Sequence, residues 1–196
     1  MAYANVVKNN GFVPFERAVV NADVRTRPVP AVRTASGGGN ASTDIAIGDA
    51  YAIDSAGNAY RAGPSDTIRG VVVGFEFQPN PSNPPGSAVN STNYITGNGG
   101  KTTTTQIASI IGIEDSACIF ECQADTLVLG TPPYGVYTIT DAAPDAFYGI
   151  SNQSVSIGGG SGGSQAKLIG LKPSPGDNSY GVGARILVQF PQMSNA

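Results

Sequence analysis

The sequence GGGSGG, which begins at Gly158, has the residue types and spacing of two kinds of reactive loop. Its glycines at Gly158, Gly160 and Gly163 fit the G-x-G-x-x-G of a loop that cradles a dinucleotide phosphate. With Gly159 and Ser161 the same six residues also fit the G-x-S-x-G of a nucleophile elbow. Both loops must open a helix, but the sequence that follows, SQAKLIGLKPSPG, is strand-like and then broken by prolines. We therefore interpret the segment as a flexible connection between two strands.

The chain contains no histidine, which excludes most of the familiar catalytic and metal sites. Ser–His and Cys–His nucleophile pairs and most zinc sites need that residue. Carboxylates are the remaining candidates, and the visible clusters are Glu114 with Asp115 and Asp141 with Asp145. Both clusters fit solvated turns equally well, and no calcium-loop pattern is present. We predict that the protein is not an enzyme and has no catalytic residues, no cofactor and no metal.

Cys118 and Cys122 stand four residues apart in the sequence ACIFEC. In a strand, this spacing separates the Cα atoms by about 13 Å, beyond the roughly 7 Å that a disulfide can bridge. Ile119 and Phe120 between them favour a strand. We expect two free, buried thiols, as in a protein that matures in a reducing cytoplasm.

The composition predicts an all-β protein. Charged residues make up 13% of the chain, where about a quarter is usual, and 26 glycines and 14 prolines favour strands joined by turns. Hydrophobic residues at 40% are enough to build a core. The segments that read as strands are 44–62 (a hairpin with its turn at 54–58), 67–77, 107–125 (strand, turn, strand), 134–140, 154–157, 166–171 and 183–190. We predict a sandwich or barrel, jelly-roll-like, with about eight to ten short strands.

The chain divides into an extended N-terminal arm, residues 1–43, and a body, residues 44–196. Residues 1–35 carry five cationic side chains against two acidic ones, although the whole chain has a net charge of −3. A basic, proline-punctuated arm suits an acidic protein surface, whereas the few cations elsewhere argue against nucleic acid as a partner. Residues 78–106, rich in Pro, Gly and Thr, predict a surface insertion. We expect no signal peptide and no membrane span.

Several sequences together resemble the capsid decoration, or cement, proteins of tailed bacteriophages. They are NADVRTRPVPAVRTASGGG, IGDAYAIDSAGNAYRAGPSDTIRGVVVGFEF, ACIFECQAD, DAFYGISNQSVSI and AKLIGLKPSPGDNSYGVGARILVQF. The C-terminal part, LIGLKPSPGDNSYGVGARILVQF, carries most of the resemblance. It departs from the simpler Pro-Asp-Asn of that class by an inserted Gly176, and the insertion 78–106 has no counterpart.

The resemblance implies a structural virion protein that is synthesised in the host bacterial cytoplasm and binds the outer surface of the capsid. It would clamp neighbouring major capsid subunits as a homo-dimer or homo-trimer and stabilise the shell against internal genome pressure. Arginines of the arm would face capsid carboxylates, and its prolines would fix an extended path. The candidate contact residues are Arg17, Arg25, Arg27, Pro28, Pro30 and Arg33.

A β-rich module that binds glycans or receptors on a phage tail or fibre is the alternative. It would use the insertion 78–106 and the tyrosines, of which the chain has eight. Tyrosine combines an apolar ring with a polar tip, so core and subunit-interface roles explain these residues better than a stacking platform does.

Overall fold

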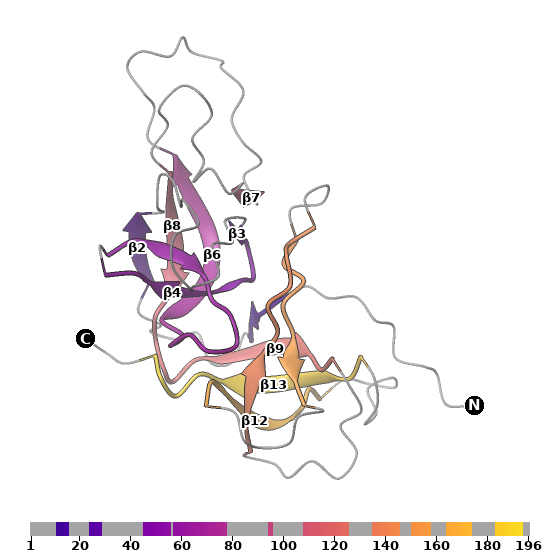
Figure 1. Cartoon of the computed structure of the whole chain (residues 1–196). Helices are drawn as coiled ribbons and strands as arrows, with labels where there is room; N and C mark the ends of the chain where they lie inside the picture. Colours follow the sequence, from indigo (N-terminus) through magenta and orange to yellow (C-terminus); the bar gives the residue numbers. More distant parts are fainter. Residues whose placement is uncertain are drawn as a thin grey trace, which may run out of the picture.

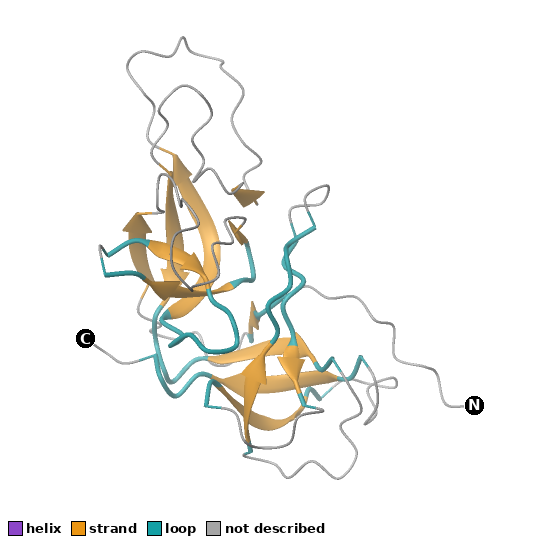
Figure 2. Cartoon of the chain, viewed as in Figure 1, coloured by secondary structure: helices purple, strands orange, loops and turns teal. Residues whose placement is uncertain are grey.

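The computed structural model describes residues 11–15, 24–28, 45–55, 57–77, 94–95, 108–125, 135–145, 150–157, 164–173 and 183–193. These residues form 13 strands and no helix (Figure 2). The predicted all-β class is confirmed, and two packed antiparallel sheets give a sandwich-like body.

The larger sheet has six strands, all paired antiparallel, and lies in the lower half of Figure 1. In spatial order they are β1 (Val13–Pro14), β9 (Ile119–Gln123), β13 (Arg185–Gln189), β12 (Ala166–Leu171), β10 (Val136–Ile139) and β11 (Val155–Ser156). Each of the predicted segments 134–140, 154–157, 166–171 and 183–190 contains one of these strands. The C-terminal segment 166–190 supplies β12 and β13, which lie in the middle of this sheet.

The second sheet has five antiparallel strands and lies in the upper half of Figure 1. In spatial order they are β2 (Val24–Pro28), β8 (Ala108–Ile113), β6 (Gly70–Phe77), β4 (Ala50–Ile53) and β5 (Ala59–Arg61). A short two-stranded sheet joins β3 (Ile45–Ala46) to β7 (Tyr94–Ile95). Apart from Tyr94 and Ile95, the predicted insertion 78–106 lies outside the described residues.

The predicted hairpin is formed by β4 and β5, and its turn chemistry is local. Asp54 accepts hydrogen bonds from the backbone N–H of Asn58 through Oδ1 at 2.9 Å and from that of Gly57 through its carbonyl at 3.0 Å. Gly57 has a φ of +87°, a conformation that favours glycine. The turn is therefore fixed by the Asp and Gly positions that predicted it.

The predicted strand, turn and strand of residues 107–125 are also present, but the two strands belong to different sheets. Strand β8 pairs with β6, whereas β9 pairs with β13. In the turn between them, Asp115 accepts the N–H of Ala117 through Oδ1 and that of Cys118 through its carbonyl. This turn therefore carries the chain from one layer of the sandwich to the other.

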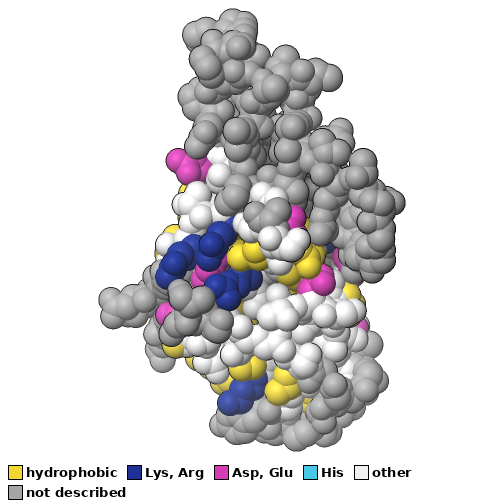
Figure 3. Space-filling model, turned by 60° about the vertical axis from the view of Figure 1, so that its left-hand side comes forward, with side chains coloured by type: hydrophobic (Ala, Val, Ile, Leu, Met, Phe, Trp, Pro, Cys, Tyr) yellow, Lys and Arg dark blue, Asp and Glu magenta, His cyan; other side chains and the backbone are white. Residues whose placement is uncertain are grey.

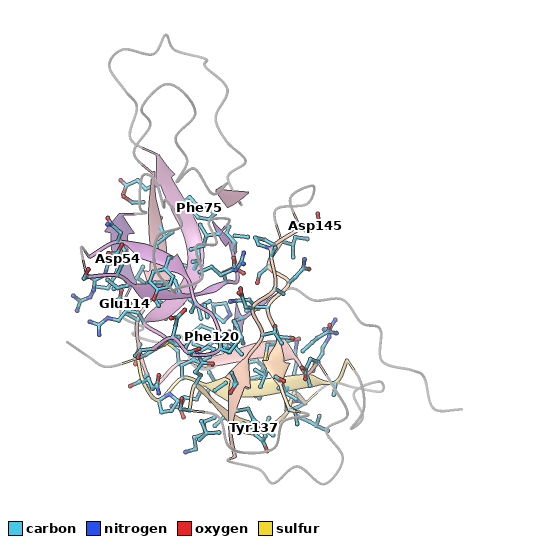
Figure 4. The ribbon with its side chains drawn as sticks, in the orientation of Figure 1. Asp54, Phe75, Glu114, Phe120, Tyr137 and Asp145 are labelled. Atoms are coloured by element: carbon cyan, nitrogen blue, oxygen red, sulfur yellow. The ribbon has the colours of Figure 1, made fainter. Side chains whose placement is uncertain are left out.

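The main core fills the space between the two sheets. Residues from both sheets form one buried cluster, which includes Ala52, Val71 and Ile113 of the smaller sheet. The ring of Phe190 meets that of Phe12 edge-on at 5.0 Å between centroids and that of Phe120 at 5.6 Å. Phe120 is labelled in Figure 4 near the level where the two sheets meet. Phe12 brings the N-terminal part of the chain into this core.

The five-stranded sheet is buried on its other face as well. There Tyr51, Val72 and Ile110 form a second cluster that Ile45 of β3 joins. The Tyr51 ring packs directly over Gly70 and Gly112, because a Cβ atom added to either glycine would lie 2.5–2.6 Å from the ring. Glycines on β6, which neighbours β4, and on β8, the next strand beyond it, thus make the space for a fully buried tyrosine.

Two buried glutamines connect the sheets by hydrogen bonds. Gln153 accepts the N–H of Ala50 at 2.7 Å and donates to the carbonyl of Ala62 at 2.7 Å. Gln165 accepts the N–H of Ile139 at 3.0 Å and donates to the carbonyls of Gly63 and Asp66. Backbone groups of the smaller sheet and of the loop that follows β5 are satisfied in this way by side chains of the larger layer.

Where the structure describes the predicted N-terminal arm, the chain belongs to the sheets and does not extend away from the body. Strand β1 pairs with β9, and β2 pairs with β8 over five residues. Phe12 is 1% exposed. The buried Phe12 and the backbone pairing of β1 and β2 with strands more than 80 positions away along the chain explain the difference, although Val13 and Val24 are 44% and 55% exposed. The rest of residues 1–43 lies outside the described residues.

The contact between Tyr51 and the glycines predicts that Gly112→Ala destabilises the fold. The added methyl group must displace a ring that is packed on every side, which should cost about 1–3 kcal/mol in the free energy of unfolding. Urea denaturation would measure the loss. Gly74→Ala on β6 is the matched control, because its Cβ would lie 3.6 Å from the nearest atom. A Gly112→Ala protein as stable as the Gly74→Ala protein would show that the ring has room to move.

Candidate functional site

The carboxylate of Glu114, which follows β8 and is 4% exposed, binds side chains from several strands of the smaller sheet. The Arg27 guanidinium of β2 binds both of its oxygens, each at 2.8 Å. The Tyr51 hydroxyl of β4 donates to it at 2.6 Å, and Arg69, just before β6, lies 3.8 Å from it. One carboxylate thus connects residues from or next to four of the five strands of the smaller sheet, on the side labelled in Figure 4.

The surroundings of Glu114 keep it ionised. Burial raises its pKa, but the hydrogen bonds from Arg27 and Tyr51 and the charges of Arg27 and Arg69 outweigh burial, so its pKa lies below the usual 4.5. Burial and the neighbouring Glu114 carboxylate raise the pKa of Tyr51 far above its usual 10. A carboxylate saturated with donors and a phenol that stays protonated form a structural ion cluster, which differs from the poised acid–base pair that catalysis requires.

Arginine side chains give this end of the smaller sheet a positive surface. Arg25 lies two residues before Arg27 on the same face of β2, and its side chain is exposed. Arg27 and Arg69 are 28% and 25% exposed, so each side chain is partly open to solvent. Figure 3 shows Lys and Arg side chains gathered about an acidic group on one face of the molecule. We call Arg25, Arg27 and Arg69 the arginine surface; with Glu114 its formal charge is +2.

The predicted capsid-contact residues divide into four groups. Arg25 is exposed on the edge strand β2, where a partner can reach it. Arg27 was predicted to face a partner's carboxylate, but in this structure it forms its bidentate ion pair with Glu114 of the same chain. Pro28 ends β2 opposite Ser109, at the sheet edge where proline is tolerated. Arg17, Pro30 and Arg33 lie outside the described residues.

The other acidic cluster weighed for catalysis, Asp141 with Asp145, makes structural bonds through the side chain of Asp141 and the backbone of Asp145. Asp141 accepts hydrogen bonds from the buried guanidinium of Arg61 at 3.0 and 3.3 Å. The backbone N–H of Asp145 bonds to the carbonyl of Ile150. Within the described ranges, no three His, Cys, Asp or Glu side chains converge as a metal site would require.

One buried carboxylate was missed by the sequence reasoning. Asp49 is 0% exposed; its Oδ2 accepts the N–H of Ala46 at 2.8 Å, and its Oδ1 has no hydrogen-bond partner among the described atoms. Burial raises its pKa to about 7, although the Ser151 hydroxyl, the Ala46 N–H and the charge of Arg61 act in the opposite direction. The available signal was an aspartate inside the otherwise apolar alternation IAIGDAYAI.

The cysteines are free and buried, as predicted. Burial is the main cause that raises the pKa of both thiols, and the charges of Asp115 and Glu121 add to it. Neither thiol is a nucleophile activated by its surroundings.

The glycine-rich segment lies outside the described residues, but its flanking elements bear on its interpretation. Strand β11 precedes it, and β12 follows from Ala166. The helix that a dinucleotide loop or a nucleophile elbow must open is therefore replaced by a strand.

A scan against protein-family models, a search of curated proteins and a search of solved structures each found no match to this chain. Among the residues that the structure describes, no helix is long and apolar enough to cross a membrane.

The Glu114 cluster predicts that Glu114→Gln lowers stability at neutral pH, by about 2 kcal/mol after allowance for the partial exposure of Arg27. Because the folded-state pKa of Glu114 is depressed, its contribution is present above the unfolded pKa of 4.5 and is lost as the pH falls through the folded value. Urea denaturation from pH 7 to pH 3 should therefore show the two proteins converging in acid. Glu76→Gln, at an exposed position on β6, is the control and should change stability by less than about 0.5 kcal/mol. A constant difference at every pH would contradict the ionic role of Glu114.

Burial also predicts that neither thiol of the native protein reacts with a thiol reagent. With 5,5′-dithiobis(2-nitrobenzoate) at pH 8, Cys118 and Cys122 should react only as fast as the chain unfolds, and both should react at once in urea. Rapid labelling of the folded protein would show that at least one thiol is accessible.

Proposed function

We propose that this chain is a structural, non-enzymatic protein of a tailed-bacteriophage particle. It decorates the outer surface of the capsid, contacts the major capsid protein and clamps neighbouring subunits, and so stabilises the shell against the pressure of the packaged genome. A clamp of this kind needs a stiff body and surfaces that bind two neighbours at once, without reactive groups.

The observation that carries the proposal is the arginine surface on an edge strand. Arg25 is exposed on β2, and Arg27 and Arg69 add positive charge beside it. Their common anchor, Glu114, holds two of the three guanidinium groups in place, so little side-chain freedom is lost when a partner's carboxylate binds. Guanidinium groups bind carboxylates in a planar, two-pronged geometry, which suits an acidic surface on the capsid exterior.

The charges on β2 disfavour pairing of this edge strand with β2 of a second copy of the chain. In an antiparallel pairing of β2 with itself centred on Thr26, Arg25 of one copy would lie opposite Arg27 of the other. Like charges directly opposite each other destabilise a pair of strands, and edge charges of this kind protect against edge-to-edge association. The homo-dimer or homo-trimer that the proposal includes therefore uses a different surface of the molecule.

The described tyrosines give no support to the alternative of a glycan-binding platform. Tyr51 and Tyr137 are 0% and 1% exposed. Tyr60 is partly buried and donates a hydrogen bond to Asp66 at 3.2 Å. These three rings contribute to the body's core and leave no stacking face for a sugar.

Co-sedimentation with capsids of the encoding phage, both unexpanded and expanded, tests the proposal. We expect saturable binding that raises the temperature at which the shells rupture. Arg25→Glu should weaken binding at least tenfold and reduce its salt dependence, because Arg25 is exposed and contributes positive charge to the surface. Lys167→Glu, on β12 of the other sheet, is the control with the same change in net charge and should bind like the wild type.

The thermal unfolding of each variant is measured first, and binding is compared only among variants that fold. Deletion of residues 1–35 would be a poorer test, because it removes β1, β2 and the buried Phe12 together. Failure of the wild-type protein to bind either form of the capsid would overturn the proposal. If Arg25→Glu binds capsids as tightly as the wild type, the arginine surface is not the capsid-binding site.

A further inference from the structure

Asp49 lies where three parts of the chain meet. The N–H of Phe12 bonds to the carbonyl of Gly48 at 2.7 Å, and the N–H of Val72 bonds to the carbonyl of Asp49 at 2.9 Å. From a third direction, Ile150 forms a parallel bridge with Ile47. The residues on either side of Asp49 thus hold the N-terminal segment, β6 and the segment before β11 in one junction.

The fit at this junction is tight. Gly11 has a φ of +64°, and a Cβ atom there would lie 2.3 Å from the carbonyl oxygen of Gly48 and 2.4 Å from the side chain of Ser151. Ser151 also favours the ionised form of Asp49 and accepts the N–H of Gln153. The carboxyl of Asp49 therefore shares the neighbour Ser151 with the backbone of the N-terminal segment, and a change at the carboxyl reaches that segment through Ser151.

Few groups around Asp49 stabilise the ionised form of its carboxyl. It is fully buried, and the uncharged groups that favour its anion are the N–H of Ala46, bonded to Oδ2, and the hydroxyl of Ser151; Oδ1 itself has no partner at hydrogen-bond geometry among the described residues. From the elements packed around it, Arg61 of β5 and Asp141 after β10 are the charged groups that act on it, and they oppose each other and form an ion pair. Residues 11–12, 71–72 and 150–153 bring no charged side chain. In the protonated form Oδ1 becomes a donor, which the adjacent Ser151 hydroxyl can accept.

We propose that Asp49 is a proton-operated latch: its neutral form holds residues 11–15 in the junction, and its ionisation releases them. Release would separate β1 from β9, because Val13 and Pro14 pair there with Glu121 and Phe120. Strand β1 has only two residues and covers the edge of the six-stranded sheet, so opening the latch exposes the edge of β9 to another strand. The inference stands on the junction alone and does not depend on the proposed capsid role.

The sign and size of the effect follow from linkage. An acid whose pKa is raised from 3.8 to about 7 in the closed state binds more protons there than in the open state, so closure weakens as the pH rises between these values. Between pH 6 and pH 8, the equilibrium constant for opening should increase by about tenfold. Above about pH 8 no further change is expected.

Amide exchange in the full-length protein, followed by NMR and corrected for the intrinsic dependence of exchange on pH, tests the latch. The reporters are the amides of Phe12 and Phe15, which donate to Gly48 and Ile119. Their protection in the wild type should fall by about tenfold from pH 6 to pH 8 and stay below that of the hydrogen-bonded amides in β13. In Asp49→Asn it should not change, and in Glu76→Gln, the control at an exposed carboxylate on β6 that does not act on Asp49, it should fall as in the wild type.

Three results would overturn the proposal: equal protection of the wild type at both pH values, the same fall in Asp49→Asn, or protection equal to that of β13, which would mean exchange by global unfolding. If Asp49→Asn does not fold, the Cγ resonance of Asp49 in the wild type replaces it. A titration midpoint near pH 7 that coincides with the loss of protection supports the latch, and a midpoint below pH 5 refutes it.

Discussion

The two sheets can be packed together only if the polar backbone groups between them are satisfied, and Gln153 and Gln165 meet this requirement. Each side chain accepts one N–H and donates to at least one carbonyl at positions that are 26 to 103 residues away along the chain. An unsatisfied peptide group in this place would cost about 1–3 kcal/mol. Apolar contacts give the sandwich most of its stability, but these directional bonds fix one alignment of the layers, because a shift of either sheet would break several of them together.

Much of the local structure could be predicted because its causes are local. The turn residues Asp54 and Gly57 and the apolar alternation on either side were sufficient to predict the hairpin. The density of β-forming residues around Cys118 and Cys122 was sufficient to predict a strand there, and therefore two thiols that form no disulfide with each other. The partners of those strands could not be predicted. Nothing in the spacing of residues 107–125 tells that the turn at Asp115 moves the chain between layers.

The candidate site was predicted only in part, for the same reason. The arginines of the N-terminal segment stood out by charge, but the partner of Arg27 is Glu114, 87 residues away. A spacing of this length carries no signal in a single sequence, since sheet pairing decides it. Asp49 escaped notice because a lone aspartate between strands usually marks a solvated turn, and only its burial distinguishes it.

Glu114 and Asp49 show how the number of donors decides what a buried carboxylate does. Both are almost inaccessible to solvent and both lie at the ends of strands in the same sheet. Glu114 receives a bidentate arginine and a phenol, so burial is outweighed and the anion fixes β2 to its neighbours. Asp49 has only the Ser151 hydroxyl and one backbone N–H beside it as uncharged donors, so burial prevails and the proton is retained up to about pH 7. The same chemical group therefore makes two different contacts in this sheet. The contact at Glu114 is constant above the acid range, whereas the strength of the junction at Asp49 depends on pH.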